Sequence, residues 1–375
     1  MVLKPGLQQE KLIEQTVGLY ESLIGDDSLE SLVWTGLGSG NPLTRDENYR
    51  WNSLADQGMF DAERQQRFIE GLEESGIRNI RVGLSNHLID IKKEESWSDH
   101  DALIRDISDA GLNISLDLHH FGIEDQFRVV DADGKTVGLQ SYYLHPAWPD
   151  YFAEFAAQAF DRYSTQIQAV TLINEPETTV GFNSEMWHGA FPGWVSPQHS
   201  FYYIERGIQV AKAAVKARIA LQKQMAVSGR RVLFVHPEAT VYKAYWADFN
   251  KYNRFFASDL ILGHQWLLEA DLDALASRPM SDIVGARTRK RTSDRTSLDW
   301  VVEKYVVNGQ SSESQELNRQ RLVSSLAELK ALHAALARDF GGVIRFLASN
   351  HLWRSGKRSA ILSCLWRSGS ACAIW

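Results

Sequence analysis

The chain has 375 residues, a formal net charge of -7 and two cysteines. This length fits one large domain, such as an α/β barrel. An acidic chain has no broad basic face that could neutralise phosphates, so we expect neither nucleic acid nor an anionic membrane as a partner. Basic residues do cluster between positions 287 and 295, and such a run is typical of a solvated loop.

Two features of the chain ends bear on compartment and cofactors. Cys364 and Cys372 both lie near the C-terminus, where they cannot form a metal site or a disulfide framework across the body of the protein. The first ten residues are polar and charged where a signal peptide would be apolar, and no apolar run approaches the roughly 18 residues that span a bilayer. We expect a soluble, cytoplasmic protein that needs no metal or organic cofactor.

Short apolar runs alternate with stretches in which apolar residues recur three and four positions apart. The runs predict eight strands, at residues 31–35, 77–83, 113–118, 169–173, 231–235, 259–262, 300–307 and 342–347. The stretches between them predict helices, at residues 62–75, 97–110, 149–163, 199–223 and 316–338. Gly76 and Gly111 follow two of these helices and are expected to take the left-handed conformation that ends a helix. This alternation predicts a parallel sheet, and eight strands favour a closed (β/α)₈ TIM barrel.

The domain organisation is expected to be simple. No repeat or Pro/Gly/Ser-rich linker divides the chain, so residues 1–348 are assigned to one catalytic domain. Residues 349–375 have a different sequence pattern. The pentapeptide LWRSG occurs at 352–356 and again at 365–369, and helical amphipathicity is absent. This segment is either a poorly ordered tail or a sequence altered near its end.

In a barrel, catalytic groups lie where strands end and the following loops begin. Polar side chains follow three of the predicted strands at this point. Arg81 belongs to the second strand end, His119 and His120 to the third, and Asn174 with Glu175 to the fourth. These residues are therefore the first candidates for a site.

Glycosidic bond hydrolysis requires a carboxylic acid that protonates the leaving oxygen, and the retaining mechanism requires a second carboxylate about 5–5.5 Å away. Glu175 suits the first role, because Asn174 can hold a sugar hydroxyl and Pro176 fixes the backbone beyond the strand. The alternative is a carboxylate at a helix N-terminus with an asparagine cap. The tripeptide Asn174-Glu175-Pro176 fits a catalytic acid and a capped helix N-terminus equally well.

The surrounding sequence favours the glycosidase. Residues 169–176, AVTLINEP, follow YFAEF at 151–155 and FDRY at 160–163. This region resembles the fourth-strand signature of clan A glycoside hydrolases, especially the family 1 β-glycosidases. The segments GIRNIRVGLS at 76–85, GLNISLDLHHF at 111–121 and WHGAFPG at 187–193 are similar to that family's second strand, third strand and acid/base loop.

The resemblance implies roles for individual residues. Glu175 would be the acid/base, Asn174 would bind the sugar 2-hydroxyl, His120 would contact the sugar, and Arg81 would lie beside the nucleophile. Arg81 is equally well explained as a buried salt-bridge partner. His119 is as readily a satisfied core histidine as a ligand.

The nucleophile is expected at the end of the seventh strand, and Glu303 in WVVEKYVVNG is the carboxylate that fits best. Its separation from Glu175 leaves room for three further strand and helix units. The Glu-Asn-Gly motif that the resemblance predicts is absent, and the same residues could form a helical turn. Glu238, in FVHPEA after the fifth strand, is the rival and is also credible as a substrate-binding carboxylate.

Other positions depart from the family pattern. His264 stands where the resemblance predicts a tyrosine after strand six, with Gln265 and Trp266 as sugar contacts. Trp353 offers a stacking platform, but the Glu-Trp pair that would read the sugar 4- and 6-hydroxyls is missing. Because of these differences, the sequence does not identify the sugar of the substrate.

The sequence thus predicts a retaining hydrolase of β-glycosides with a carbohydrate substrate. Two alternatives remain: a carbohydrate-binding barrel that has lost its nucleophile, and an endo-glycanase closer to family 5. The sequence gives no oligomeric state.

Overall fold

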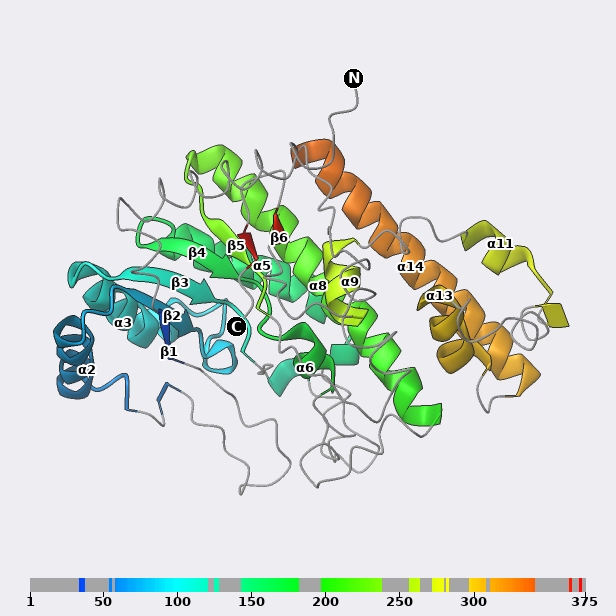
Figure 1. The fold of residues 1–375 in the computed structure, drawn as a ribbon, viewed down its shortest axis with the longest axis horizontal. Helices are drawn as coiled ribbons and strands as arrows, with labels where there is room; N and C mark the ends of the chain where they lie inside the picture. Colours follow the sequence, from blue (N-terminus) through cyan, green and yellow to red (C-terminus); the bar gives the residue numbers. More distant parts are fainter. Residues whose placement is uncertain are drawn as a thin grey trace, which may run out of the picture.

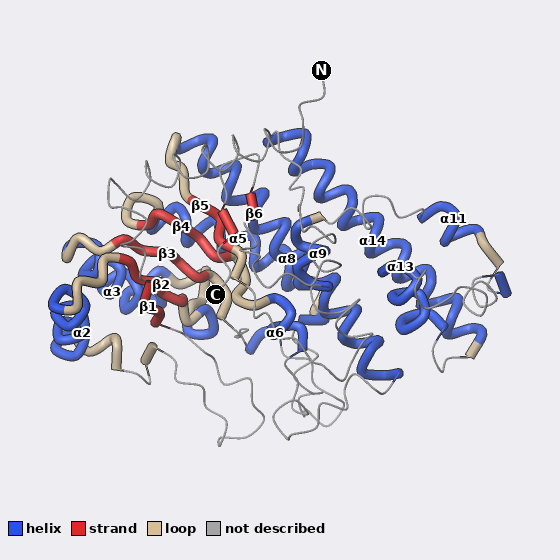
Figure 2. Tube along the Cα trace, in the orientation of Figure 1, coloured by secondary structure: helices blue, strands red, loops and turns tan. Residues whose placement is uncertain are grey.

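The computed structural model describes residues 34–37, 54–55, 58–120, 125–127, 143–181, 197–237, 256–263, 272–279, 281–282, 297–307, 311–340, 364–365 and 371–372. The described residues form two regions, one that contains a sheet with its covering helices and one that is built from helices (Figure 2). The strands gather in one part of the molecule and long helices fill the other.

A five-stranded parallel sheet is the centre of the first region (Figure 1). Its strands are β1 (Trp34–Leu37), β2 (Asn79–Gly83), β3 (Asn113–Asp117), β4 (Ile167–Thr171) and β5 (Leu233–Val235). They lie in chain order and each pairs with the next. A doubly wound sheet reverses its order at a switch point, whereas successive strands of a barrel advance in one direction. The described order has no reversal, and closure into a barrel stays a prediction.

The two faces of this sheet differ in chemistry. Since side chains alternate along a strand, Ile80, Ile114 and Val170 share one face, and all three belong to the apolar core. The other face carries Arg81 and Asp117, together with Ser115 and Thr171. The polar candidates therefore lie on the face opposite the helix-packed core.

Helices of the first region bury their apolar stripes in that core. They are α2 (Ala62–Glu74), α3 (Ser98–Asp109) and α5 (Trp148–Tyr163), with short 3₁₀ turns η2 (Asn86–Leu88), η3 (Glu94–Trp97) and η4 (Asp125–Phe127). Asp61 caps α2 by accepting a hydrogen bond from the Arg64 N–H at 2.9 Å. Gly76 and Gly111 have φ values of 71° and 75°, which confirms their predicted role as helix terminators.

The second region is helical. It contains α6 (Pro176–Gly181), α8 (Pro197–Ser228), α9 (Phe256–Leu262), α11 (Leu272–Ser277), α13 (Ser297–Val301), the π-helix η8 (Val302–Val307) and α14 (Ser312–Phe340). The long helix α8 joins the regions, because it packs on α5 and also on α9 and α14. Among the described helices, none has a stretch long and apolar enough to cross a membrane.

Two predicted strands are wrong. Residues 259–262 belong to helix α9, and residues 300–307 form α13 and η8. A short, fully buried apolar run does not separate a strand from a buried helix. In the second case the segment is buried at residues 300–302 and again at 305–307, without the alternation of a half-buried strand, so the pattern fits a buried helix.

The other predicted elements compare more closely. The predicted strands at 77–83, 113–118 and 231–235 are confirmed, while β1 and β4 are displaced by two or three residues. All five predicted helices are confirmed. The predicted strand at 342–347 lies outside the described residues. In the C-terminal segment, β6 (Cys364–Leu365) and β7 (Ala371–Cys372) pair in antiparallel fashion.

Candidate active site

The carboxyl ends of β2, β3 and β4 meet at one edge of the sheet. Backbone pairing continues past the regular strands there, because the Leu84 N–H donates to Asp117 O at 2.8 Å and the Leu118 N–H donates to Thr171 O at 2.9 Å. The Asn174 N–H donates to His119 O at 2.9 Å. Polar residues distant in sequence are thus held at neighbouring positions.

Four side chains form a connected group at this edge, here called the strand-end network: Arg81, Asp117, His120 and Asn174. Arg81 Nη2 donates to Asp117 Oδ2 and to Asn174 Oδ1, both at 2.7 Å. His120 Nδ1 lies 2.8 Å from the same Asp117 Oδ2, and His120 Nε2 lies 3.4 Å from Asn174 Nδ2. The structure therefore brings together three of the predicted site residues around a carboxylate to which the sequence assigned no role.

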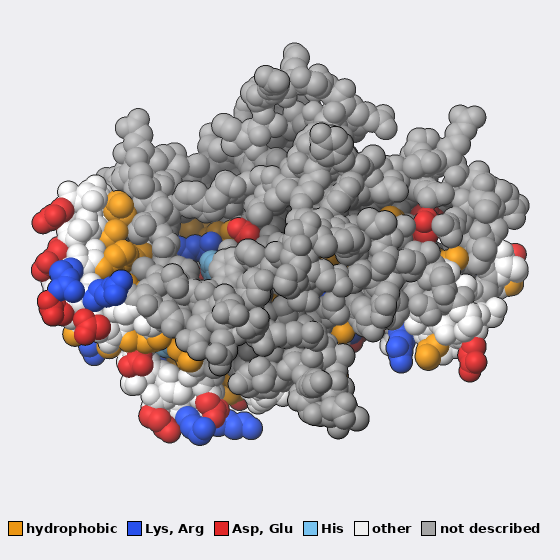
Figure 3. Space-filling view, turned by 90° about the horizontal axis from the view of Figure 1, so that it is seen from below, with side chains coloured by type: hydrophobic (Ala, Val, Ile, Leu, Met, Phe, Trp, Pro, Cys, Tyr) orange, Lys and Arg blue, Asp and Glu red, His pale blue; other side chains and the backbone are white. Residues whose placement is uncertain are grey.

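The members of the strand-end network differ in solvent exposure, which decides which of them a ligand can reach. The side chains of Arg81 and His120 are 20% and 19% exposed, whereas that of Asp117 is 1% exposed and residue Asn174 is 2% exposed. Seen from below, basic, acidic and histidine side chains meet in one recess, apart from the charged side chains at the ends of the molecule (Figure 3). Arg81 and His120 are therefore the members that a bound molecule can reach, whereas Asp117 and Asn174 lie behind them.

Glu175 follows the network directly and has an unusual backbone. Its φ is 40°, and it has the one positive φ among the described non-glycine residues. Such a conformation costs about 1–3 kcal/mol and persists only where the surroundings hold it. Here the Glu175 N–H donates to Pro237 O at 3.2 Å, and Glu175 O accepts from the Thr179 N–H at 2.8 Å. Half-buried Glu175 is thereby turned out of the strand at its end.

Helix α6 anchors this turn to the helical region. Glu177 accepts hydrogen bonds from the N–H groups of Ala257 and Ser258 at 2.5 and 3.2 Å, at the start of α9, and from the Tyr203 hydroxyl of α8. A carboxylate is favourable at a helix N-terminus, because it satisfies free N–H groups and complements the helix dipole. Glu177 therefore fixes the residues that follow Glu175, a role that its position two residues later did not signal.

His119 is a core residue. It is fully buried, with Nδ1 3.4 Å from Asn86 Nδ2 and Nε2 3.2 Å from the Tyr143 hydroxyl. Burial lowers the pKa of His119 from 6.5 to about 3, although the nearby Asp117 opposes the shift. Of the two explanations that the sequence left open, the satisfied core histidine is the one that fits.

Glu303 does not lie at a strand end. It is on η8, which packs against α8, α13 and α14, and α13 stands well apart from the sheet (Figure 1). The argument for Glu303 as nucleophile, including the resemblance, placed it at the end of a seventh strand, and the described residues 300–307 are helical instead.

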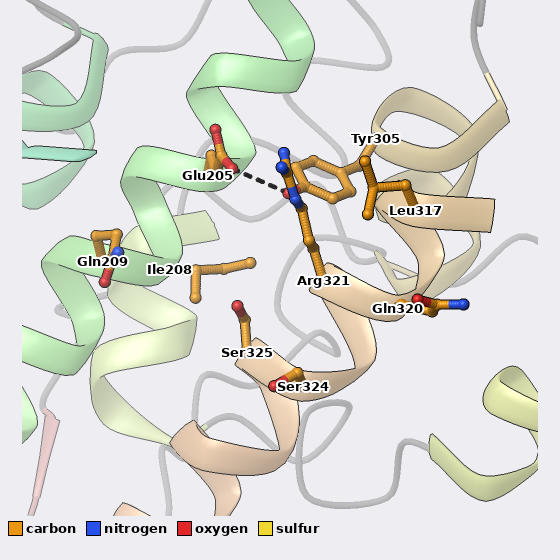
Figure 4. Close-up of a pocket in the computed structure, with 9 residues that line it drawn as sticks. All are labelled: Glu205, Ile208, Gln209, Tyr305, Leu317, Gln320, Arg321, Ser324 and Ser325. Atoms are coloured by element: carbon orange, nitrogen blue, oxygen red, sulfur yellow. Dashed lines mark hydrogen bonds between the residues drawn. The ribbon is translucent and has the colours of Figure 1, made fainter. Parts of the chain in front are cut away.

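A cavity of about 350 Å³ lies between α8 and α14, next to η8 (Figure 4). Tyr305 of η8 donates to Glu205 of α8 at 3.1 Å, and Arg321 of α14 lies beside the pair. Burial raises the pKa of Glu205, while the bond from Tyr305 and the charge of Arg321 oppose the shift. The strand-end network contributes no residue to this cavity.

The remaining predicted site residues, Glu238, His264, Gln265, Trp266 and Trp353, lie outside the described residues. Within the part of the chain that the structure describes, no group of three histidine, cysteine or acidic side chains is arranged to hold a metal ion.

No family model and no curated protein matches the chain. Among solved structures, it is similar to a β-glucosidase from Thermotoga maritima in complex with cyclophellitol, with 13% identity, a TM-score of 0.45, and coverage of 80% of this chain and 61% of that one. A structure of a family 1 β-glucosidase from the same organism gives 13% identity and a TM-score of 0.41 over 72% of this chain and 57% of that one. For a β-glucosidase from Exiguobacterium marinum the values are 14% and 0.40, over 69% and 52%. The chain thus spans less than two thirds of the length of these structures.

Proposed function

We propose that this chain is a glycoside hydrolase that cleaves β-glycosides with retention, on a sheet that closes into a (β/α)₈ barrel. Glu175 protonates the leaving oxygen and then activates the water that releases the sugar. The observation that supports this proposal is the strained Glu175 backbone, held at the end of a parallel strand directly after a member of the strand-end network.

The network suits a polyhydroxylated ligand. Arg81 and His120, the partly exposed members, offer a guanidinium and an imidazole to a ligand, and the buried Asn174 amide contacts both of them. A sugar hydroxyl both donates and accepts hydrogen bonds, so it matches such a group. No metal or organic cofactor enters the proposed reaction.

Double displacement needs a second carboxylate within about 5–5.5 Å of the first. Glu303 is the proposed nucleophile, with Glu238 as its rival. The second candidate function, a carbohydrate-binding protein without turnover, is favoured by one observation: the segment that carries Glu303 is helical where a catalytic strand was predicted.

Covalent trapping separates these functions. The protein is incubated with activated 2-deoxy-2-fluoro-β-glycosides of several sugars, and the peptides are sequenced by mass spectrometry. The proposal expects one sugar adduct per chain on a glutamate, at Glu303 if the nucleophile is assigned correctly. An adduct on Glu238 moves the nucleophile and keeps the mechanism. Sugar binding measured by calorimetry, with neither adduct nor turnover, would establish the binding protein instead.

A further inference from the structure

Asp117 holds a position in the strand-end network that none of the predicted roles explains. Its side chain is 1% exposed, and a single oxygen, Oδ2, serves both Arg81 at 2.7 Å and His120 at 2.8 Å. A substrate that touches Arg81 or His120 therefore does not touch Asp117. Its influence passes through those two side chains.

The contacts of Asn174 determine where the proton of His120 lies. Asn174 Oδ1 accepts from Arg81, so the amide nitrogen is the group that faces His120 Nε2. An amide nitrogen donates, and Nε2 must then be the accepting nitrogen of the ring. The proton of the neutral imidazole is left on Nδ1, where it donates to Asp117 Oδ2.

The neighbouring histidine has the opposite arrangement. Asn86 Nδ2 faces Nδ1 of His119, so Nδ1 accepts and the proton lies on Nε2, toward the Tyr143 hydroxyl. No carboxylate contacts the His119 ring in the described hydrogen bonds. Two adjacent histidines thus differ in tautomer, and the carboxylate of Asp117 accompanies the one that faces the site.

We propose that Asp117 is a positioning residue: it fixes His120 as the Nδ1–H tautomer and, with Arg81, fixes the direction of the Asn174 amide beside Glu175. If Asp117 is removed, the His120 proton is free to move to Nε2, which would then oppose the amide N–H groups of Asn174. The network would lose its orientation although its other members remain. The catalytic consequence depends on the proposed function, whereas the tautomer does not.

The direct test is nitrogen NMR of the imidazole rings in protein labelled with ¹⁵N-histidine. His119→Gln and His120→Gln variants assign the two rings. In the parent protein we expect Nδ1 protonated in His120 and Nε2 protonated in His119, and in Asp117→Ala we expect His120 alone to change. Ser115→Ala, on the same face of the same strand, is the matched control and should leave both rings unaltered.

Two results would overturn the proposal: an Nε2–H tautomer of His120 in the parent protein, or an Asp117→Ala spectrum identical to the parent's. The parent spectrum decides the first point even if Asp117→Ala does not fold.

A kinetic measurement tests the consequence for catalysis. Asp117→Asn keeps the size of the side chain and removes its charge. We expect kcat on β-glycosides to fall about 10- to 100-fold with little change in KM, by analogy with the buried partners that orient metal-ligating histidines. Parent-like kcat would contradict a positioning role in catalysis. Absence of glycosidase activity in the parent, with the expected tautomers present, would refute the proposed function and leave the tautomer assignment intact.

Discussion

The strand-end network and the cavity beside η8 both bury a carboxyl group, but they stabilise it differently. Asp117 has an arginine nitrogen at 2.7 Å and an imidazole at 2.8 Å, contributed by β2 and by the loop after β3. Glu205 has a tyrosine hydroxyl at 3.1 Å, and burial raises its pKa. The first arrangement links the ends of neighbouring strands through one carboxylate oxygen, whereas the second links α8 to η8. The comparison teaches that burial of a carboxyl group does not by itself mark a candidate site; Asp117 differs because one of its oxygens contacts both an arginine and a histidine at the ends of neighbouring strands.

The largest stability effect is expected from breaking the charge pair of the network. Arg81→Met leaves the carboxylate of Asp117 buried without its cation, which costs about 3–5 kcal/mol of unfolding free energy. Arg67→Met, which removes an exposed pair with Glu63, is the control and should cost less than about 1 kcal/mol. Chemical denaturation measures both. If both variants lost the same unfolding free energy, the ion pair of the strand-end network would stabilise the protein no more than an exposed ion pair does.

The buried histidine next to the network makes stability depend on pH. The folded pKa of His119 is about 3, so the unfolded chain takes up a proton below pH 6.5 that the folded chain does not. Its contribution is therefore complete above pH 6.5 and is lost as the pH falls. We expect a loss of about 2 kcal/mol between pH 6.5 and about pH 5. His119→Gln should remove this part of the slope, and a variant with the parent's slope would exclude His119 as its source.

Packing between the helices of the second region gives a smaller effect. A Cβ atom on Gly207 of α8 would lie 2.6 Å from the ring of Phe256, a buried residue of α9. Overpacking of this kind costs about 1–3 kcal/mol, and the higher helix propensity of alanine returns about 1 kcal/mol. Gly207→Ala should therefore lose about 1 kcal/mol of unfolding free energy.

Gly71 of α2 is the matched control, because a Cβ atom added there would meet no other atom within 4 Å. Gly71→Ala should gain about 0.5–1 kcal/mol. If both alanine variants gain stability, α8 and α9 are not in close contact.

The smallest effect is expected at Glu205. Since burial raises its folded pKa, the folded chain holds a proton that the unfolded chain has released, and stability falls as the pH rises from the ordinary value of 4.5 through the folded pKa. Glu205→Gln should weaken this dependence and leave glycoside cleavage unchanged. Thermal unfolding between pH 4 and pH 8 measures the first expectation. A lower cleavage rate would give the cavity a part in the reaction.

The sequence predicted the sheet region well because its signals are local. Short apolar runs, apolar helix stripes and the terminating glycines Gly76 and Gly111 each act within a few residues. The helical region was harder, since Val301, Val302 and Val306 suggest a strand by residue type while their burial comes from packing against other helices.

The candidate site was also predicted only as far as local sequence signals reach. Strand-end positions predicted that Arg81, His120 and Asn174 would meet, because parallel strands bring their carboxyl ends together. The role of Asp117 was not predicted, although an acidic residue in the apolar strand ISLDL was a signal for it. Which partners its oxygen would serve depends on the register of three strands, and residue type does not give that.

Glycoside cleavage by Glu175→Gln, with Glu205→Gln as the control, tests the central claim most directly. Substrates with alkyl leaving groups need a proton from the acid, whereas dinitrophenyl glycosides do not. The account predicts that the kcat/KM of Glu175→Gln falls about 10²- to 10⁴-fold on alkyl β-glycosides and much less on dinitrophenyl β-glycosides. Glu205→Gln is expected to match the parent on both substrates. A Glu175→Gln protein that cleaves alkyl β-glycosides at the parent's rate would contradict the account.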